Sequence, residues 1–445
     1  MIDDLGDKRV VVMGLGRFGG GAATARYLVN QGAQVLVTDL DPPESLGPSL
    51  AQLADLPIEY RLGEHRAGDF TSADLIVVNP AVDPRNNNFL RAAAAIGVPT
   101  TSEIRLLVSR LPNRGHTIAV TGTAGKSTVT AMIGHILAKT IGTDRVHVGG
   151  NIGKSLLNEL NRIQHDHWVI LELSSFMLES LAEDCWSPHI AVITNFSSNH
   201  LDRHVTLEAY QAAKQLILDF QKPDKDIAIF GPCIHNRFLS RVERMCYREQ
   251  KDLDEGEHPL LLIPGRHNQM NALLAAVAVE KTNGLQWEQA ASTLKDFAGL
   301  PHRLDFVREH DGTRYFNDSK STTPQAAILA IECFDRGIVH VILGGYDKAS
   351  DMQQLADCAS QRCRAVYTIG ATGEFIAQAC TATNAAADVV HCGTVEQAVK
   401  QTTNRVRHGD VVLLSPGCAS WDQFDNYEHR GGAFIGAVNK YVAPV

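Results

Sequence analysis

The chain of 445 residues lacks the long apolar runs of membrane proteins. Its longest uninterrupted apolar run, residues 272–279, has about eight residues, whereas a membrane-spanning helix needs about 20. The first six residues include two aspartates and no basic residue, which argues against a signal peptide. We therefore expect a cytoplasmic protein that neither crosses a membrane nor binds one.

Paired cysteines and basic blocks are also missing. The nine cysteines are scattered and none forms a C-x-x-C pair, so we predict free thiols rather than a zinc site or a disulfide framework. The 41 basic residues are outnumbered by 50 acidic ones, which gives a net charge of −9. That balance argues against nucleic-acid binding through bulk charge, but it does not exclude a local cationic pocket.

The residues that are present have a globular composition, with 44% apolar and 20% charged side chains. At roughly 100–200 residues per domain, the length predicts three domains. Short β-branched runs, such as 117–121, 365–369 and 411–414, alternate with helical patterns along the chain. Because these runs are apolar and separated by helices, we expect α/β domains with parallel sheets covered on both faces.

The first glycine loop, Gly14-Leu15-Gly16-Arg17-Phe18-Gly19, follows an apolar strand and opens a helix, and Asp39 ends the next strand. This is the context of a dinucleotide-binding fingerprint. Glycines let the backbone approach a phosphate, and a helix N-terminus offers free N–H groups. A nicotinamide is not required, because a mononucleotide diphosphate with a ribose fits the same loop. Alternatively, the glycines only pack the strand on the helix.

The second glycine loop runs from Val120 to Ser127 and contains Gly125-Lys126-Ser127. The strict P-loop pattern has glycine where this chain has Val120, so the match is incomplete. The chemical elements are still there, since backbone N–H groups can surround phosphate, Lys126 can reach the β and γ oxygens, and Ser127 can hold Mg²⁺. We predict ATP binding here.

Three further residues are candidates for the metal chemistry that follows from ATP. Glu172 ends an apolar strand and either binds Mg²⁺ or caps a neighbouring helix. His200 lies in the loop after the next strand and is either a metal ligand or a polar surface residue. Lys214 lies within a predicted helix and would by itself be interpreted as a solvated lysine.

Several motifs in a fixed order identify a resemblance to a known family. They are Thr121–Ser127, Asn195–Arg203, Gly265–Ala272, Leu300–Arg303, Asp318–Lys320 and Leu414–Phe424. Together they resemble the Mur ligases of peptidoglycan synthesis, and among them the members that join D-glutamate to UDP-N-acetylmuramoyl-L-alanine. The resemblance is dense over residues 117–271 and 301–431 and thin in the first 110 residues.

The resemblance implies a fold and a reaction. The fold is a Rossmann-like domain over residues 1–103, a central P-loop domain over 104–299 and a Rossmann-like C-terminal domain over 300–445, with a hinge at Gly299–Pro301. The reaction is ATP-dependent amide formation through an acyl phosphate and a tetrahedral intermediate. It implies ATP, two Mg²⁺ ions and a carbamate on Lys214 as cofactors, and a monomer whose third domain swings onto the ATP site.

The resemblance also implies roles for individual residues. The ATP site is Gly122, Thr123, Gly125, Lys126, Ser127, Thr128, Asn268, Asn271, Arg303 and Asp318. The metal ligands are Ser127, Glu172, His200 and Lys214, and the catalytic residues are Lys126, His200, Lys214 and Lys320. The UDP-substrate site is Gly14, Leu15, Gly16, Arg17, Asp39 and Asn151. The D-glutamate site is Thr322, Lys348, Ser420 and the main chain near Tyr427.

Some positions depart from the family pattern, and other functions remain open. Asn199 stands where the family has Asp before the metal-binding His, and Arg17 stands where small residues are common. A related ligase that adds another amino acid is one alternative, although the chain lacks the Asp-Asn-Pro-Arg segment of the relatives that add diaminopimelate or lysine. A nicotinamide oxidoreductase and an ATP-binding module without chemistry are the others.

Overall fold

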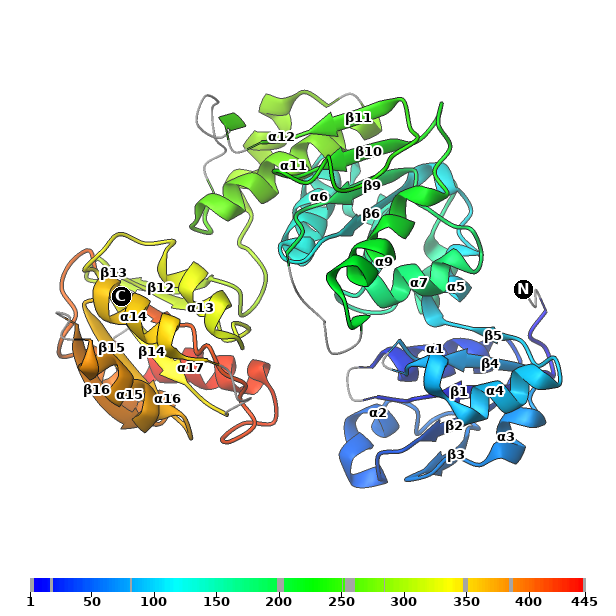
Figure 1. Cartoon of the computed structure of the whole chain (residues 1–445), viewed down its shortest axis with the longest axis horizontal. Helices are drawn as coiled ribbons and strands as arrows, with labels where there is room; N and C mark the ends of the chain where they lie inside the picture. Colours follow the sequence, from blue (N-terminus) through cyan, green and yellow to red (C-terminus); the bar gives the residue numbers. More distant parts are fainter. Residues whose placement is uncertain are drawn as a thin grey trace. The chain divides into compact units, whose positions relative to one another are not determined.

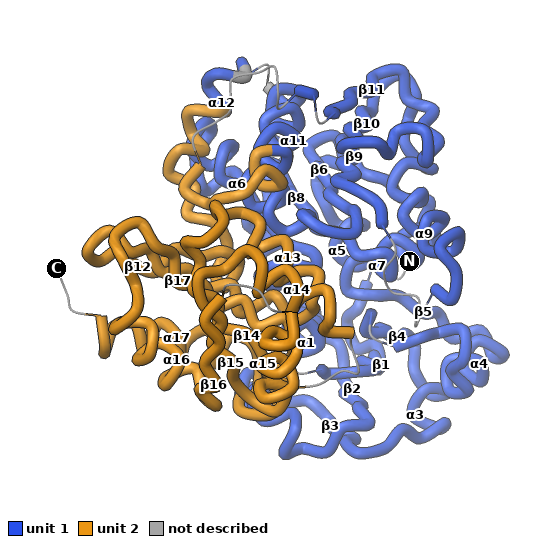
Figure 2. Tube along the Cα trace, turned by 60° about the vertical axis from the view of Figure 1, so that its left-hand side comes forward, with its two compact units in different colours: residues 1–257, 270–290 blue, residues 258–269, 291–445 orange. Residues whose placement is uncertain are grey.

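The computed structural model of the chain describes residues 4–16, 19–80, 82–197, 204–249, 251–252, 261–283, 285–346, 351–383 and 387–442. These residues form three β-sheets with helices between the strands (Figure 1). They group into two compact units, residues 1–257 with 270–290 as unit 1 and residues 258–269 with 291–445 as unit 2 (Figure 2). None of the described helices is long and apolar enough to cross a membrane.

The first sheet has five strands in the order β3-β2-β1-β4-β5, all paired in parallel. The strands are β1 (Arg9–Met13), β2 (Gln34–Asp39), β3 (Glu59–Leu62), β4 (Leu75–Val78) and β5 (Thr100–Thr101). The helices are α1 (Gly20–Asn30), α2 (Gly47–Ala51), α3 (Ala67–Thr71), α4 (Asn88–Ala95) and α5 (Glu103–Val108). Alternate residues of β1 face opposite sides: Val10 and Val12 pack in the cluster of α1, and Val11 and Met13 in that of α3 and α4.

The central sheet has six parallel strands in the order β11-β10-β9-β6-β8-β7. They are β6 (Thr117–Thr121), β7 (Val146–Gly150), β8 (Trp168–Glu172), β9 (Ile190–Ile193), β10 (Ile227–Phe230) and β11 (Arg244–Tyr247). The helices are α6 (Lys126–Ile141), α7 (Ser175–Ala182), α9 (Leu207–Asp219), α11 (Arg266–Asn283) and α12 (Trp287–Thr293). Because the strands are parallel, the segments after β6, β8 and β9 all leave from one edge of the sheet.

The first two sheets share one hydrophobic core, which explains why they form a single unit. One cluster of buried residues extends from β1 and α1 through α5 to β8 and β9. Polar contacts reinforce it: Arg105 pairs with Asp184 at 2.7 Å, and the hydroxyls of Ser102 and Ser180 lie 2.7 Å apart. Such a continuous apolar contact resists separation more than a short linker alone would.

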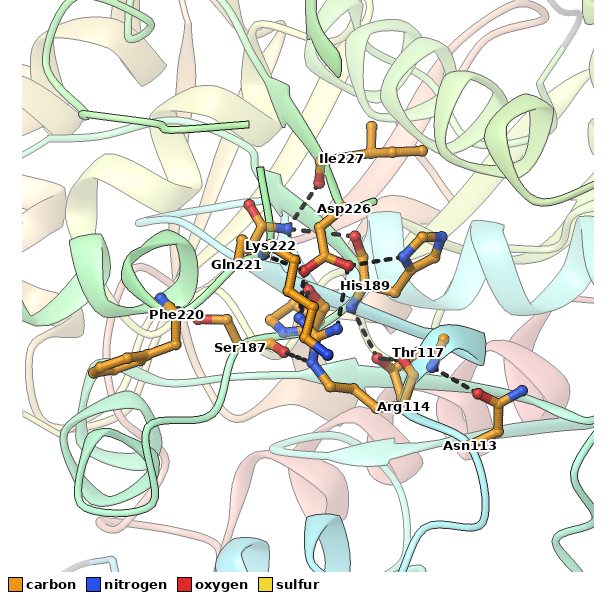
Figure 3. Close-up of polar contacts among 12 residues, drawn as sticks. Asn113, Arg114, Thr117, Ser187, His189, Phe220, Gln221, Lys222, Asp226 and Ile227 are labelled. Atoms are coloured by element: carbon orange, nitrogen blue, oxygen red, sulfur yellow. Dashed lines mark hydrogen bonds and ion pairs between the residues drawn. The ribbon is translucent and has the colours of Figure 1, made fainter. Parts of the chain in front are cut away.

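A buried carboxylate ties together the amino-terminal ends of the central strands (Figure 3). Asp226, which precedes β10 and is 1% exposed, accepts hydrogen bonds from Arg114 at 2.5 and 3.1 Å and from the Lys222 N–H at 2.6 Å. It also lies 3.0 Å from the His189 ring, just before β9. Arg114 in turn donates to the Ser187 carbonyl. This edge of the sheet is opposite the one from which the glycine loop leaves, so the network fixes the strands rather than a ligand.

The third sheet has six strands in the order β12-β13-β17-β14-β15-β16. They are β12 (Asp305–His310), β13 (Thr313–Asn317), β14 (Val339–Gly344), β15 (Ala365–Ile369), β16 (Asp388–Gly393) and β17 (Val411–Leu414). The helices are α13 (Pro324–Ile331), α14 (Gln353–Arg362), α15 (Gly373–Ala382), α16 (Val395–Thr402) and α17 (Tyr427–Tyr441). The expected parallel sheets are confirmed, and the third sheet adds one antiparallel pair, β12 and β13. The two-residue turn Asp311-Gly312, with φ of 49° and 73°, permits only a hairpin.

Candidate active site

The second glycine loop has a shape that only glycine permits at two positions. Gly122 has a φ of 144° and Gly125 a φ of 79°. A Cβ at Gly122 would lie 2.0 Å from the Thr194 hydroxyl, and one at Gly125 would lie 2.6 Å from the Asn271 side-chain oxygen. Both glycines are therefore required for the close turn that leads from β6 into α6.

Asn195, at the end of β9, holds this loop in place. Its side-chain oxygen accepts from the Ala124 N–H at 2.9 Å, its amide donates to the Ala124 carbonyl at 2.9 Å, and its own carbonyl accepts from the Thr123 N–H at 3.1 Å. Lys126 bends back, so that its Nζ donates to the Thr123 carbonyl at 3.0 Å. A rigid loop with a lysine at a helix N-terminus is a site for phosphate.

Glu172 ends β8, beside Val120 of β6, and is 2% exposed. Its Oε1 accepts from the Asn151 amide at 2.8 Å, whereas its Oε2 is buried and has no hydrogen-bond partner among the described residues. Leaving a buried carboxylate oxygen without a partner costs free energy. The chemistry of this position therefore fits a divalent cation, for which a carboxylate is a preferred ligand.

Lys214, on α9, is buried with 1% exposure. Its Nζ donates to the Gly122 carbonyl at 2.8 Å and lies 4.5 Å from the centre of the Tyr210 ring. Burial, together with the nearby Lys126 ammonium, lowers the pKa of Lys214 to about 7, while Glu172 acts weakly in the opposite direction. The sequence expectation of a solvated lysine, taken without the resemblance, is therefore wrong: α9 turns Lys214 towards the glycine loop.

Several predicted residues lie outside the described part of the chain or away from these side chains. Arg17, His200 and Lys348 fall outside the described residues. Asn268 and Asn271 are both buried, three positions apart on α11, and the boundary between the two units falls between them. Ser127 and Thr128 are buried in the first turn of α6.

Unit 1 also contains a cavity of about 1100 Å³. One wall comes from the first glycine loop, Asp39 and the start of α1, and the other from residues 150–159 of the central sheet's domain. The Asp39 carboxylate accepts from the Leu15 and Gly16 N–H groups at 2.8 and 3.0 Å. Those two amides are thus engaged with Asp39. The first turn of α1, which no side chain of the described residues caps, is therefore the part of this wall that offers uncapped N–H groups to a ligand.

In unit 2, the ends of β13 and β17 bring further predicted residues together. Asp318, 5% exposed, accepts from the hydroxyls of Ser321 and Ser415 at 2.5 and 2.7 Å and from the Leu304 N–H at 3.1 Å. Burial outweighs these hydrogen bonds and raises the pKa of Asp318 to about 6. Lys320 lies with its Nζ 5.1 Å from the centre of the Tyr427 ring.

Arg430 is a residue that sequence reasoning missed. It is the largest fully buried side chain of the described residues, and it donates to the carbonyls of Cys418, Ala419 and Ser319 at 3.0, 3.0 and 2.8 Å. Arg430 thereby links the backbone just before the buried Ser420 to the backbone just before Lys320. Nothing in its local sequence distinguishes it from a solvated arginine of α17.

Comparison with known proteins gives a consistent picture. Three family models match in order: the Mur ligase MurD-like N-terminal domain over residues 8–102, the Mur ligase middle domain over 120–245 and the Mur ligase glutamate ligase domain over 302–418. UDP-N-acetylmuramoylalanine–D-glutamate ligase of Koribacter versatilis (strain Ellin345) is 38% identical over 98% of both chains. The enzyme of the same name from Roseiflexus sp. (strain RS-1) is 38% identical over 98% of this chain and 99% of its own.

Solved structures agree at the level of the fold. The ligase MurC from Thermotoga maritima, 20% identical, superposes with a TM-score of 0.61 over 97% of this chain and 99% of its own. The MurF ligase from Thermotoga maritima in complex with ADP, 16% identical, gives a TM-score of 0.59 over 99% and 100%. The predicted α/β fold is confirmed, and the resemblance seen in the sequence is confirmed by relatives that cover nearly the whole chain. The chain belongs to the Mur ligase family and is an ATP-dependent ligase.

Proposed function

We propose that this chain uses ATP to join the amine of D-glutamate to the L-alanyl carboxyl group of UDP-N-acetylmuramoyl-L-alanine. The observation that carries this proposal is the position of Lys126, Glu172 and Lys214 around one phosphate-binding loop, in a chain whose relatives bear the name of that ligase. The three residues come from three different segments, so their meeting at one edge of the central sheet is not a consequence of local sequence.

The ATP site is assigned to the loop between β6 and α6. Gly122, Thr123 and Gly125 supply the backbone, Lys126 faces the β and γ phosphates, and Ser127 and Thr128 follow in α6. Asn268 and Asn271 are assigned to the adenine, and Arg303 and Asp318 to contacts from unit 2. The closely packed loop and the uncapped start of α6 support this assignment.

Mg²⁺ is assigned to Ser127, Glu172, His200 and the modified Lys214. Bound there, the ions neutralise the charge that develops as the γ-phosphoryl group is transferred. The unpartnered Oε2 of Glu172 supports this assignment, and Asn151 orients the carboxylate by donating to Oε1.

We assign a carbamate to Lys214. The buried amine faces a carbonyl and the loop, and its hydrogen-bond partners among the described residues include no carboxylate, so that only the charge of Glu172 acts in favour of an ammonium there. A neutral amine adds to CO₂, with loss of one proton, to give a carboxylate-like group. A pKa near 7 leaves a large share of the amine neutral at physiological pH. The modification replaces a buried cation by an anion suited to a metal.

The two substrates are assigned to different units. The UDP-substrate is assigned to the cavity of unit 1, which Gly14, Leu15, Gly16 and Asp39 line, with Asn151 between that cavity and Glu172. Arg17, outside the described residues, is assigned to the same substrate. D-Glutamate is assigned to unit 2. Its residues are Thr322, Lys348, Ser420 and the main chain near Tyr427.

The chemistry proceeds in balanced steps. A carboxylate oxygen of the L-alanyl group attacks the γ-phosphorus and ADP leaves, which gives an acyl phosphate. The D-glutamate amine attacks the acyl carbon to form a tetrahedral intermediate, which loses phosphate and a proton to give the amide. Negative charge gathers at one point in each step, and Lys126 and Lys320 are assigned to stabilise it.

We propose further that the domains are residues 1–103, 104–299 and 300–445, and that the protein acts as a cytoplasmic monomer. The three sheets support this division, because their strands lie within residues 9–101, 117–247 and 305–414 respectively, although residues 258–269 and 291–299 of the second domain group with unit 2.

The test is phosphate release by the full chain. We expect release only when ATP, Mg²⁺, UDP-N-acetylmuramoyl-L-alanine and D-glutamate are all present, and a mixture that lacks any one of them is the control. A competition among D-glutamate, L-glutamate, glycine, L-alanine and diaminopimelate then identifies the amino acid. Absence of release from the complete mixture contradicts the proposal, and preference for another amino acid corrects the substrate alone.

A further inference from the structure

The cavity of unit 1 contains a cationic residue that the proposed function does not use. The cavity lies between the first glycine loop and residues 150–159, and its volume is about 1100 Å³. On the first wall, the 11-residue helix α1 begins after Gly19, whose φ is 86°, and no side chain of the described residues caps it. The N–H groups and partial positive charge of that helix end favour an anion.

Three other charged side chains around the cavity are already engaged or have a shifted pKa, and the remaining two, Asp41 and Glu159, are acidic. Asp39 accepts from two backbone N–H groups of the loop. Arg26 is paired with Asp55 at 2.6 Å. Burial raises the pKa of Glu103, which favours its neutral form, although a hydrogen bond with Ser155 acts in the other direction. These three residues line the cavity but none of them is a cation available to a ligand.

Lys154 differs from them. Its side chain is exposed and lines the cavity, and the described residues give its ammonium neither an ion pair nor a hydrogen bond. Lys154 therefore offers an ammonium on the wall opposite α1 that no described residue engages.

The segment that carries Lys154 is fixed on both sides. Asn151 donates to Glu172 through its side chain and its backbone N–H, each at 2.8 Å. Asn158 donates to the Ala23 carbonyl of α1 at 3.0 Å, which ties the segment to the first wall. The backbone of Lys154 is therefore held beside the cavity, and only its side chain must order when a ligand binds.

We propose that Lys154 binds the diphosphate of the UDP-substrate, as the cation that faces the helix end of α1 from the second wall of the cavity. The inference rests on the proposed function and adds a residue to its substrate site. A diphosphate offers several anionic oxygens, and an ammonium forms charge-assisted hydrogen bonds with them. Lys154 follows β7 of the central sheet, whereas α1 follows β1 of the first sheet. A diphosphate between them therefore bridges the two walls of the cavity.

This role predicts a distinctive pattern of ligand preference. Lys154 interacts with the phosphate charge, so its removal weakens binding of UDP but not of uridine, which has no phosphate. The interaction is electrostatic and partly exposed, so it weakens as the salt concentration rises. A residue that only shaped the cavity would affect both ligands alike and would show no dependence on salt.

The experiment is isothermal titration of the full chain with UDP and with uridine. We compare the unchanged protein with Lys154→Met and Lys154→Arg. The matched control is Lys225→Met, which removes an exposed lysine that is also in the domain of the central sheet but does not line the cavity. We expect Lys154→Met to weaken UDP binding about tenfold and uridine binding not at all. Lys154→Arg keeps most of the affinity for UDP, and Lys225→Met keeps all of it.

Kinetics supply a second measurement. We expect Lys154→Met to raise KM for the UDP-substrate with kcat and KM for ATP unchanged, because the lost contact is made equally in the ground state and the transition state. Equal affinity of Lys154→Met and the unchanged chain for UDP overturns the role of Lys154 and leaves the proposed function intact. Failure of the unchanged chain to bind either UDP or the UDP-substrate overturns both.

Discussion

At the scale of single residues, Lys214 has the most unusual environment of the candidate site. Lysine is almost never fully buried unless it is paired, yet Lys214 is 1% exposed, and its ammonium lies beside a carbonyl, a hydroxyl and an aromatic ring of the described residues. An unmodified ammonium in that position is costly, since its charge has left water without a hydrogen-bonded anion and with only Glu172 to offset the loss. The environment therefore supports the proposed carbamate on Lys214.

We predict that Lys214→Met lowers turnover by about 100-fold or more while the fold and ATP binding persist, because methionine fills a similar volume but cannot carry a carboxylate. Phosphate release and ATP titration measure the two effects. Carbon NMR after incubation with labelled bicarbonate should show a carbamate signal in the unchanged chain and none in the variant. The matched control is Lys222→Met, which removes an exposed lysine near the end of α9. Normal turnover of Lys214→Met would rule out the assigned role.

The sequence predicted some site residues for physical reasons and missed others. The position of Glu172 at a strand end near the glycine loop follows from parallel strands, whose carboxyl ends meet at one edge. The burial of Lys214 and the role of Arg430 depend on contacts between distant segments: Arg430 meets Ser319 across 111 residues of chain. Such contacts leave no local pattern. The roles inherited from the family remain predictions, including those of Arg17, His200 and Lys348.

At the scale of elements, the predicted strands that match best are buried on both faces. Thr117–Thr121, Ala365–Ile369 and Val411–Leu414 have the predicted bounds, because continuous burial produces a continuous apolar run. The strands β3, β11, β12 and β16 lie at sheet edges and are only partly buried, so their sequences mix polar and apolar residues and were not predicted. Whether a strand lies at the edge depends on the whole sheet, so the local sequence does not reveal it.

The network around Asp226 gives a prediction for these elements. Burial alone would raise the pKa of Asp226, but the hydrogen bonds from His189, Arg114 and the Lys222 N–H outweigh it and lower the pKa to about 2. A carboxyl whose pKa falls on folding stabilises the native state above the unfolded pKa, here 3.8. That stabilisation disappears as the pH falls through about 2.

We therefore expect Asp226→Asn to lower the free energy of unfolding at pH 7 by about 2 kcal/mol. The difference in the free energy of unfolding between the variant and the unchanged chain should narrow below pH 3.8 and vanish near pH 2. Urea unfolding followed by circular dichroism at several pH values measures it. Asp224→Asn, which removes an exposed carboxylate of the same turn, is the control and should have no effect. A deficit that persists unchanged at low pH would point to lost packing instead of the carboxylate.

At the scale of the whole molecule, the distribution of hydrophobic cores determines how the chain unfolds. In unit 1, a single cluster of buried residues connects the first two sheets, and Arg105 with Asp184 adds an ion pair across them. In unit 2, the two clusters on either face of the third sheet contain no residue of unit 1. The three domains expected from the family are therefore packed into two compact units, and we expect each unit to unfold cooperatively.

We predict two transitions in differential scanning calorimetry of the full chain, and UDP should raise only one of them, because a ligand stabilises the unit that binds it. Arg105→Gln should lower that same transition, since it removes the ion pair with Asp184 inside unit 1. Asp410→Asn should lower the other, since Asp410 is buried in unit 2 and accepts from Arg364 at 3.1 Å. Were UDP to raise both transitions equally, or were each variant to lower both, the two units would unfold together and the separation of their cores would not govern stability.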